Sequence, residues 1–148
     1  KQNIIQDTLM ASNPRLPTSI AKEYAKHVVS AANYFKVDPF LVAAVMIKES
    51  TANFMSASSS SCGLMQIHWE VHKEWLKAKF GIKSKRDIYD PKTNIYAGAM
   101  LLSGYLTKEG SVEGALARYL GAPSREYAGF VIAKQRTMLR KYKQLVER

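Results

Sequence analysis

The sequence predicts an all-α protein, and three patterns support this prediction. Every residue from Phe40 to Ile47 is apolar, with no polar face at the helical period, which is typical of a helix buried on all sides. The pair Asp38-Pro39 precedes this run, and Asp90-Pro91 repeats the combination of an N-cap carboxylate with a proline suited to a first helical turn. Elsewhere, apolar residues recur at three- and four-residue spacing. We therefore expect amphipathic surface helices packed around one central helix.

The remaining helices are predicted from this spacing, in chain order. Residues 1–16 have weak periodicity and predict a short helix or a strap across the core. Thr18 or Ser19 is expected to cap the next helix, which would then fold back against the central one. Residues 69–80 predict a surface helix that buries Val71 and Trp75. Further helices are expected over residues 90–106, 111–119 and 124–145.

Length and composition predict one domain over residues 1–148, with residues 1–16 as an N-terminal extension or strap. The chain of 148 residues is 47% hydrophobic, which is enough for a sizeable core. Cys62 is the only cysteine, so no disulfide can form within the chain. No apolar run reaches the length of a transmembrane helix. The net charge of +10 favours an anionic partner, and nucleic acid, lipid headgroups and cell-wall polymers all qualify.

The central helix is predicted to end in a candidate general acid. Its last turn carries Glu49, where the helix C-terminus and apolar neighbours both disfavour the ionised carboxylate and so raise the pKa. A long polar loop, rich in Ser, Thr and Asn, then extends to Cys62. Loops of this length in compact domains are often functional, and this one leaves room for a short bent hairpin.

Several of these residues together resemble the soluble lytic transglycosylase family. They are Glu49-Ser50, Phe54, Ala57 and Ser58, then Gly63-Leu64-Met65-Gln66-Ile67, Asp90-Pro91, Asn94-Ile95, Gly98 and Tyr119. The resemblance covers roughly residues 20–142 and implies a lysozyme-like fold, with a small hairpin at most beside the site. It also implies cleavage of peptidoglycan glycan strands, with Glu49 as the catalytic acid. The chain departs from the family at Leu120, where asparagine is usual, and in a shortened segment before Gly63.

The resemblance implies a set of substrate-binding residues around Glu49. Ser58 is the first choice for a helper serine, while Gln66 and Tyr119 would position a sugar acetamido group; Tyr127 completes the set. Met65 suits the face of a sugar, although a core position accounts for it as well. For Gln66 and Tyr119 the alternatives are a buried amide that satisfies loop backbone and simple core packing.

His68 and His72 have the spacing of metal ligands on a helix, but no third ligand recurs nearby, and we expect two solvated surface histidines. Neither a metal nor another cofactor is therefore expected. The other acids suggest structural roles, with Asp38 and Asp90 as caps.

The resemblance thus implies a lytic transglycosylase that leaves 1,6-anhydromuramoyl ends. A goose-type-lysozyme-like hydrolase and a catalytically silent wall-binding module remain alternatives. A nucleic-acid binder is disfavoured, because the most unusual stretch is an apolar helix with Glu49 and a polar loop rather than a basic recognition helix. The expected partners are peptidoglycan strands and an anionic wall surface. We expect a monomer in the cell envelope, periplasmic or extracellular.

Overall fold

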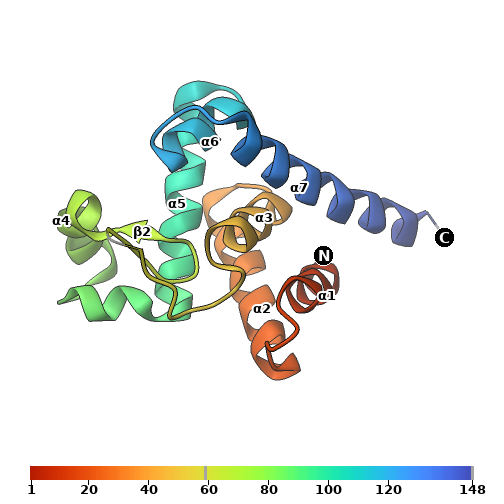
Figure 1. The fold of residues 1–148 in the computed structure, drawn as a ribbon, viewed down its shortest axis with the longest axis horizontal. Helices are drawn as coiled ribbons and strands as arrows, with labels where there is room; N and C mark the ends of the chain where they lie inside the picture. The colour runs from red at the N-terminus through yellow and green to blue at the C-terminus, as the bar shows by residue number, and fades with distance from the viewer. Residues whose placement is uncertain (59, 148) are drawn as a thin grey trace.

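The computed structural model of the protein, which describes residues 1–58 and 60–147, is mainly α as predicted. Figure 1 shows helices grouped around α3, with the hairpin and α4 at one end of the molecule and the end of α7 at the other. The helices are α1 Gln2–Ser12, α2 Thr18–Phe35, α3 Pro39–Ser50, α4 Trp69–Phe80, α5 Pro91–Glu109, α6 Val112–Leu120 and α7 Arg125–Val146, with a 3-10 helix, η1, at Lys85–Tyr89. The only strands in the described residues are β1 Ser61–Cys62 and β2 Ile67–His68.

Helix α3 lies in the centre of the protein and is buried from Pro39 to Ile47, as its uniformly apolar sequence predicts. Helices α1, α2, α5 and α7 all contact it (Figure 1). Because each side of α3 faces a different neighbour, no polar residue could occupy this run without a buried partner.

Asp38 fixes the start of α3 and also fastens α7 to it. One oxygen of its carboxylate accepts a hydrogen bond from the backbone N–H of Phe40 at 2.9 Å, which confirms the predicted N-cap. The other oxygen accepts a bond from the Gln135 amide of α7 at 2.8 Å. One carboxylate therefore satisfies a helix end and sets how α7 lies across it.

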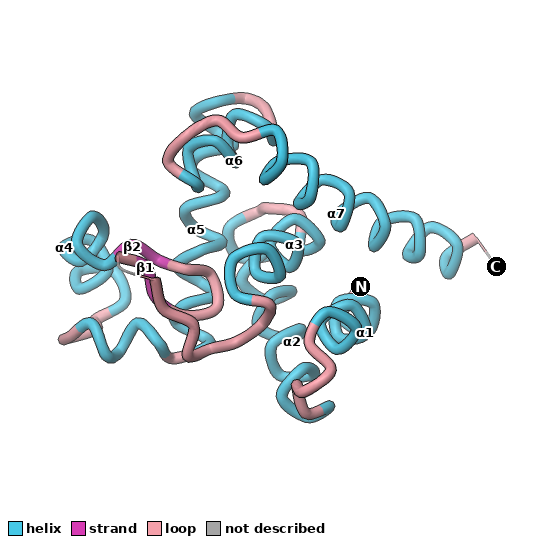
Figure 2. The backbone as a smooth tube through the Cα atoms, viewed as in Figure 1, coloured by secondary structure: helices cyan, strands magenta, loops and turns pink. Residues whose placement is uncertain are grey.

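The hairpin is short and is held by a buried side chain of α5. Strands β1 and β2 pair antiparallel, with Ser61 opposite His68. Asn94 is fully buried beneath them and donates to the carbonyls of Cys62 at 2.9 Å and Ile88 at 2.8 Å, while its oxygen accepts from the N–H of Met65. Figure 2 shows how little strand there is, with loop leading into it from α3. Long-range side-chain bonds therefore replace an extended ladder.

Gly63 makes this arrangement possible. It has φ +80, and a Cβ there would lie 2.4 Å from the Asn94 amide nitrogen. Any side chain at this position would push Asn94 away from its partners, in addition to the strain of a left-handed backbone.

Two local predictions are wrong. Helix α2 begins at Thr18 with Pro17 as its N-cap, and no side chain caps it, so neither Thr18 nor Ser19 has the predicted role. In α4 the buried residues are Trp69 and Leu76, whereas Val71 is 65% exposed and Trp75 is half-buried. The buried residues of α4 lie at other positions than those that the spacing indicated.

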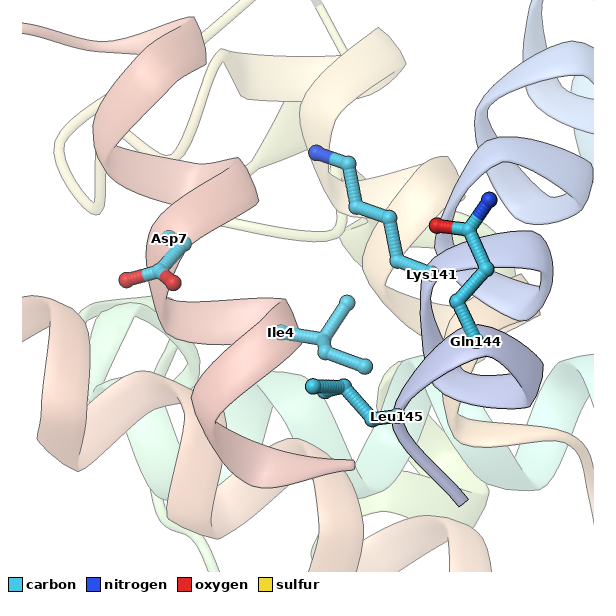
Figure 3. A pocket seen from close by; sticks show the side chains of 5 residues that line it. All are labelled: Ile4, Asp7, Lys141, Gln144 and Leu145. Atoms are coloured by element: carbon cyan, nitrogen blue, oxygen red, sulfur yellow. The ribbon is translucent and has the colours of Figure 1, made fainter. Parts of the chain in front are cut away.

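Helix α1 packs against the end of α7 and leaves a shallow hollow of about 250 Å³ between them. Figure 3 shows Ile4 and Leu145 pointing toward one another across this hollow, with Asp7 and Lys141 on its two sides. Residues 1–16 therefore contain a helix, which was one of the two forms predicted. Among the described residues, no helix combines the length and apolar character needed to cross a bilayer.

The Asn94 contacts predict a large stability loss on truncation. Asn94→Ala would leave one buried N–H and two buried carbonyls without their partner, and each such group costs about 1–3 kcal/mol. We expect the free energy of unfolding to fall by at least about 2 kcal/mol in urea denaturation. Asn33→Ala, on the exposed face of α2, is the control and should change it by less than about 0.5 kcal/mol. Equal losses in the two variants would contradict the role given to Asn94.

Candidate active site

A cavity of about 350 Å³ lies where the end of α3, the hairpin and α6 meet. Glu49 enters it from α3, Gln66 from the hairpin turn, and Tyr119 from α6. The other residues that line it are Ser58, Ser61 and Leu120. The structure thus brings Glu49, Ser58, Gln66 and Tyr119 together, four of the residues singled out from the sequence.

Glu49 occupies the last turn of α3 and is half-buried, because the polar end of this helix follows directly on its buried core. Burial raises the pKa of the Glu49 carboxyl, opposed by a hydrogen bond from Tyr127 and by the charge of Lys48. The Tyr127 hydroxyl donates to Oε2 of Glu49 at 2.5 Å. The Glu49 carboxyl therefore has a pKa above its ordinary value, and one of its oxygens is held in place by Tyr127.

The chain turns sharply after Glu49 through two left-handed residues that are not glycine. Thr51 has φ 53 and Ala52 has φ 58, while the N–H of Thr51 still bonds to the carbonyl of Ile47 at 3.0 Å. A β-branched residue in this conformation is strained. The turn buries Ala52 and directs the loop back toward the hairpin. The sequence carries no signal for it, since glycine would be the usual residue here.

Tyr119 is bound to the hairpin as well as lining the cavity. Its hydroxyl donates to the carbonyl of Met65 at 2.6 Å. Burial holds the pKa of Tyr119 well above its ordinary value, with a further contribution from Glu49. Tyr119 therefore stays neutral, and its oxygen keeps a lone pair that could accept a bond from a ligand N–H.

Gln66 uses its amide nitrogen on the loop and leaves its oxygen for the cavity. Its NH₂ group donates to the carbonyls of Ser56 and Gly63, both at 2.9 Å. Its backbone is left-handed, with φ 51. The amide thus satisfies loop backbone, which was the alternative interpretation. The same bonds fix the orientation of Oε1, which makes no hydrogen bond with the described residues.

Ser58 and Met65 lie very differently with respect to the cavity. Ser58 is exposed at the rim, and its backbone N–H bonds to the carbonyl of Ser61 at 3.0 Å. Met65 is fully buried and does not line the cavity. Its side chain packs against Gly98, where an added Cβ would lie only 2.7 Å from it. Its thioether lies in the core, so no sugar reaches it in this structure.

The sequence did not identify three features of the site. Ser61 lines the cavity, but nothing in a run of serines distinguishes it. Leu120 also lines it and is 43% exposed, so the departure from the usual asparagine places an apolar wall beside Glu49. Tyr127 was predicted to bind substrate, whereas its hydroxyl donates to Glu49. Its place in the first turn of α7 is the one sequence feature that relates it to α3.

The two histidines near α4 both have local structural contacts, and His72 is partly buried, unlike the solvated side chain that was predicted. His68 caps α4 by accepting from the N–H of Val71 at 3.3 Å, and His72 accepts from the indole of Trp75 at 2.9 Å. Burial lowers the pKa of His72, and His68 lowers it further. Within the described residues, no three His, Cys, Asp or Glu side chains gather in a way that could hold a metal ion.

A mainly α fold built on a buried helix, with a small hairpin beside a cavity that contains one glutamate, defines a lysozyme-like protein. The family model for the transglycosylase SLT domain matches residues 26–130. This chain belongs to that family, as its motifs predicted. The matched span includes Glu49, the hairpin, Tyr119 and Tyr127.

Two curated relatives resemble the chain. The membrane-bound lytic murein transglycosylase E of Buchnera aphidicola is 35% identical over 88 residues, which cover 55% of this chain and 39% of the relative. The transglycosylase of Enterobacteria phage PRD1 is 32% identical over 121 residues, which cover 76% of this chain and 43% of the relative. The chain therefore spans less than half the length of either relative.

The contact between Tyr127 and Glu49 predicts a pKa change of known sign. The Tyr127 hydroxyl stabilises the ionised Glu49 carboxylate and so lowers the pKa of Glu49. Tyr127→Phe removes this effect, while burial continues to raise the pKa. We expect the pKa of Glu49 to rise in a carbon-detected NMR titration of its side-chain carboxyl. Tyr96→Phe, which leaves the cavity untouched, is the control. An unchanged or lower pKa in Tyr127→Phe would show that the bond does not govern Glu49.

Proposed function

We propose that this chain is a lytic transglycosylase that cleaves the β-1,4 bond between N-acetylmuramic acid and N-acetylglucosamine in peptidoglycan and leaves 1,6-anhydromuramoyl ends. One observation carries the proposal: Glu49 is the only carboxylate among the described residues that line the cavity. It combines partial burial with a raised pKa, and both favour a role as general acid.

A lone carboxylate restricts the mechanism. A retaining glycosidase needs a second carboxylate about 5 Å from the acid, and an inverting one needs a base about 6.5–9.5 Å away to activate water. The side chains opposite Glu49 are instead hydroxyls, an amide and a leucine. Substrate assistance requires neither a second carboxylate nor a positioned water, and so it fits this cavity best.

In the first step, Glu49 protonates the glycosidic oxygen as the bond from that oxygen to C1 of the muramic acid breaks. The carbonyl oxygen of the same sugar's acetamido group forms a bond to C1 and stabilises the positive charge that develops there. The glucosamine end leaves with the proton, and Glu49 becomes a carboxylate.

In the second step, Glu49 acts as the base. Its carboxylate takes the proton from the C6 hydroxyl of the muramic acid, whose oxygen attacks C1 and displaces the acetamido oxygen. The nucleophile is part of the substrate and already lies near C1, so no water enters the product. Glu49 regains its proton and is ready for the next cycle.

Four side chains support these steps. Oε1 of Gln66 and the hydroxyl oxygen of Tyr119 can each accept the acetamido N–H, because the hydrogens of both groups are already bonded to loop carbonyls. Tyr127 keeps Glu49 oriented in both protonation states. Ser58 at the rim is suited to contact a neighbouring sugar.

The similarity to two proteins named as transglycosylases supports the same reaction for this chain. Its site of action would then be the cell envelope, periplasmic or extracellular, where peptidoglycan strands are found. The chemistry uses one copy of the cavity and no cofactor, and we propose that the enzyme acts as a monomer.

The outer face of α7 is suited to hold the enzyme on an anionic wall. Arg136, Arg140 and Lys143 are exposed and lie on one face, at spacings of four and three residues. None of the ion pairs in the described part of the chain involves α7. Together with the net charge of +10, this unpaired row favours association with polymers that carry carboxylate or phosphate groups.

The first prediction of the proposed function concerns Glu49 itself. Glu49→Gln should remain folded and lose at least about a hundredfold of the cleavage rate on purified sacculi, because an amide is neither an acid nor a base. The folded-state pKa of Glu49 is raised, so ionisation destabilises the native state as pH rises through that pKa. Glu49→Gln should therefore gain stability relative to the wild type at pH 7, and the gain should shrink at pH 4. A folded variant with wild-type cleavage would refute the assignment.

The second prediction concerns the product. Mass spectrometry of digested sacculi should show muramoyl ends lighter by one water than those of a hydrolase. Reducing muramoyl ends alone would instead indicate a goose-type-lysozyme-like hydrolase. If wild-type protein that binds sacculi releases no soluble fragments, the chain is a silent wall-binding module.

The third prediction concerns α7. Sacculus binding by the triple variant Arg136→Gln, Arg140→Gln, Lys143→Gln should weaken and lose most of its salt dependence, since exposed charges are screened within about 10 Å at 0.1 M salt. The control is Lys83→Gln, Lys85→Gln, Arg86→Gln, which removes the same charge from an exposed segment elsewhere. Identical co-sedimentation curves for the two triple variants would place the adhesive surface elsewhere than on α7.

A further inference from the structure

A second hollow lies beside the segment that follows Glu49. Its volume is about 460 Å³, within the range of roughly 300–1,000 Å³ that is usual for small-molecule sites. The segment between α1 and α2 forms one wall, and residues 52–54 form the opposite one. Apolar side chains make up most of its surface, including Leu16, Ile20 and Phe54.

A buried hydroxyl without a protein partner opens into this hollow. Tyr24 is only 3% exposed and lines the hollow, yet its hydroxyl makes no hydrogen bond with any residue that the structure describes. Among the described residues, every fully buried side-chain oxygen or nitrogen has a hydrogen-bond partner. Because the Tyr24 hydroxyl has none, it is not fully buried, and it belongs to the small exposed part of this side chain. Burial raises the pKa of Tyr24, so this hydroxyl stays protonated and able to donate.

Further donors surround the hollow at its rim. Arg15 lines it, is exposed, and takes part in none of the ion pairs of the described residues. The side-chain oxygens of Asn13 and Asn53 accept bonds from the N–H groups of Arg15 and Met55, which leaves both NH₂ groups without a partner in the described chain. One positive charge and three neutral donors thus surround an apolar floor.

We propose that this hollow binds the stem peptide carried by the lactyl group of the muramic acid next to the cleaved bond. The identity of this ligand rests on the proposed function, whereas the evidence for a binding site comes from the residues that line the hollow. A stem peptide combines small apolar side chains with peptide carbonyls and free carboxylates. Its methyl groups match the apolar floor, its carbonyls match Tyr24 and the asparagines, and a carboxylate matches Arg15.

The position of the hollow fits this occupant. Residues 52–54, which form one of its walls, follow Glu49 by three to five positions, and the left-handed pair Thr51 and Ala52 connects this wall to the end of α3. A peptide attached to a sugar in the Glu49 cavity would follow this segment to reach the hollow.

The binding experiment uses the whole chain and a synthetic stem tripeptide of L-alanine, γ-linked D-glutamate and a diamino acid. Titration followed by NMR should shift the signals of Tyr24 and Phe54. Arg15→Gln and Tyr24→Phe should each weaken binding about tenfold, as expected for the loss of one hydrogen bond from a bound ligand. Arg86→Gln and Tyr34→Phe, at exposed positions outside the hollow, are the matched controls. Circular dichroism establishes that every variant is folded.

The activity experiment compares glycan strands that carry stem peptides with strands stripped of them by an amidase. In Arg15→Gln and Tyr24→Phe the ratio of kcat/KM for peptide-bearing over stripped strands should fall about tenfold, and in the controls it should not. If the wild type cleaves neither substrate, the proposed function fails and the binding experiment alone decides about the hollow. Absence of tripeptide binding, or equal binding of a tripeptide of ordinary L-residues, overturns the proposal.

Discussion

The lack of any polar face on α3 is the constraint on which the other elements depend. A helix that is apolar from Phe40 to Ile47 can be stable only if neighbours cover every side of it, which is why α1, α2, α5 and α7 are arranged around it. The constraint also acts at the end of the helix. Glu49 stands two positions after the buried run, so it cannot reach full solvation, and this incomplete solvation raises its pKa.

The hairpin shows how a small lobe can be held without a sheet of its own. Two strands of two residues each would not be stable alone, and Asn94 supplies the missing bonds from α5. Tyr119 adds a bond from α6 to the carbonyl of Met65. The residues that line the cavity are therefore positioned mainly by side chains of the helical core, which come from distant parts of the sequence.

The sequence predicted what is encoded locally. The Asp38 cap, the buried run of α3 and the start of α5 at Asp90-Pro91 are short-range patterns, and all are present. The wrong buried side of α4 and the missing side-chain cap on α2 have another origin, because packing against neighbours decided both. The same holds in the site: Glu49 was found from the end of its helix, whereas its bond with Tyr127 spans 78 positions and has no local signature. The double left-handed turn at Thr51 could not be predicted either, since its strain is sustained only by the surrounding structure.

The contact of Met65 with Gly98 has a consequence for motion. The Met65 side chain lies so close to Gly98 that there is no room even for a Cβ, and Asn94 adds its bonds one turn away on the same helix. The hairpin and α5 must then move as one rigid body. Residues 51–58 belong to the covalent connection between this body and α3. The left-handed pair Thr51 and Ala52 stands at the start of that connection, where a small change in two backbone angles would swing the rim of the cavity while leaving Glu49 fixed to the core.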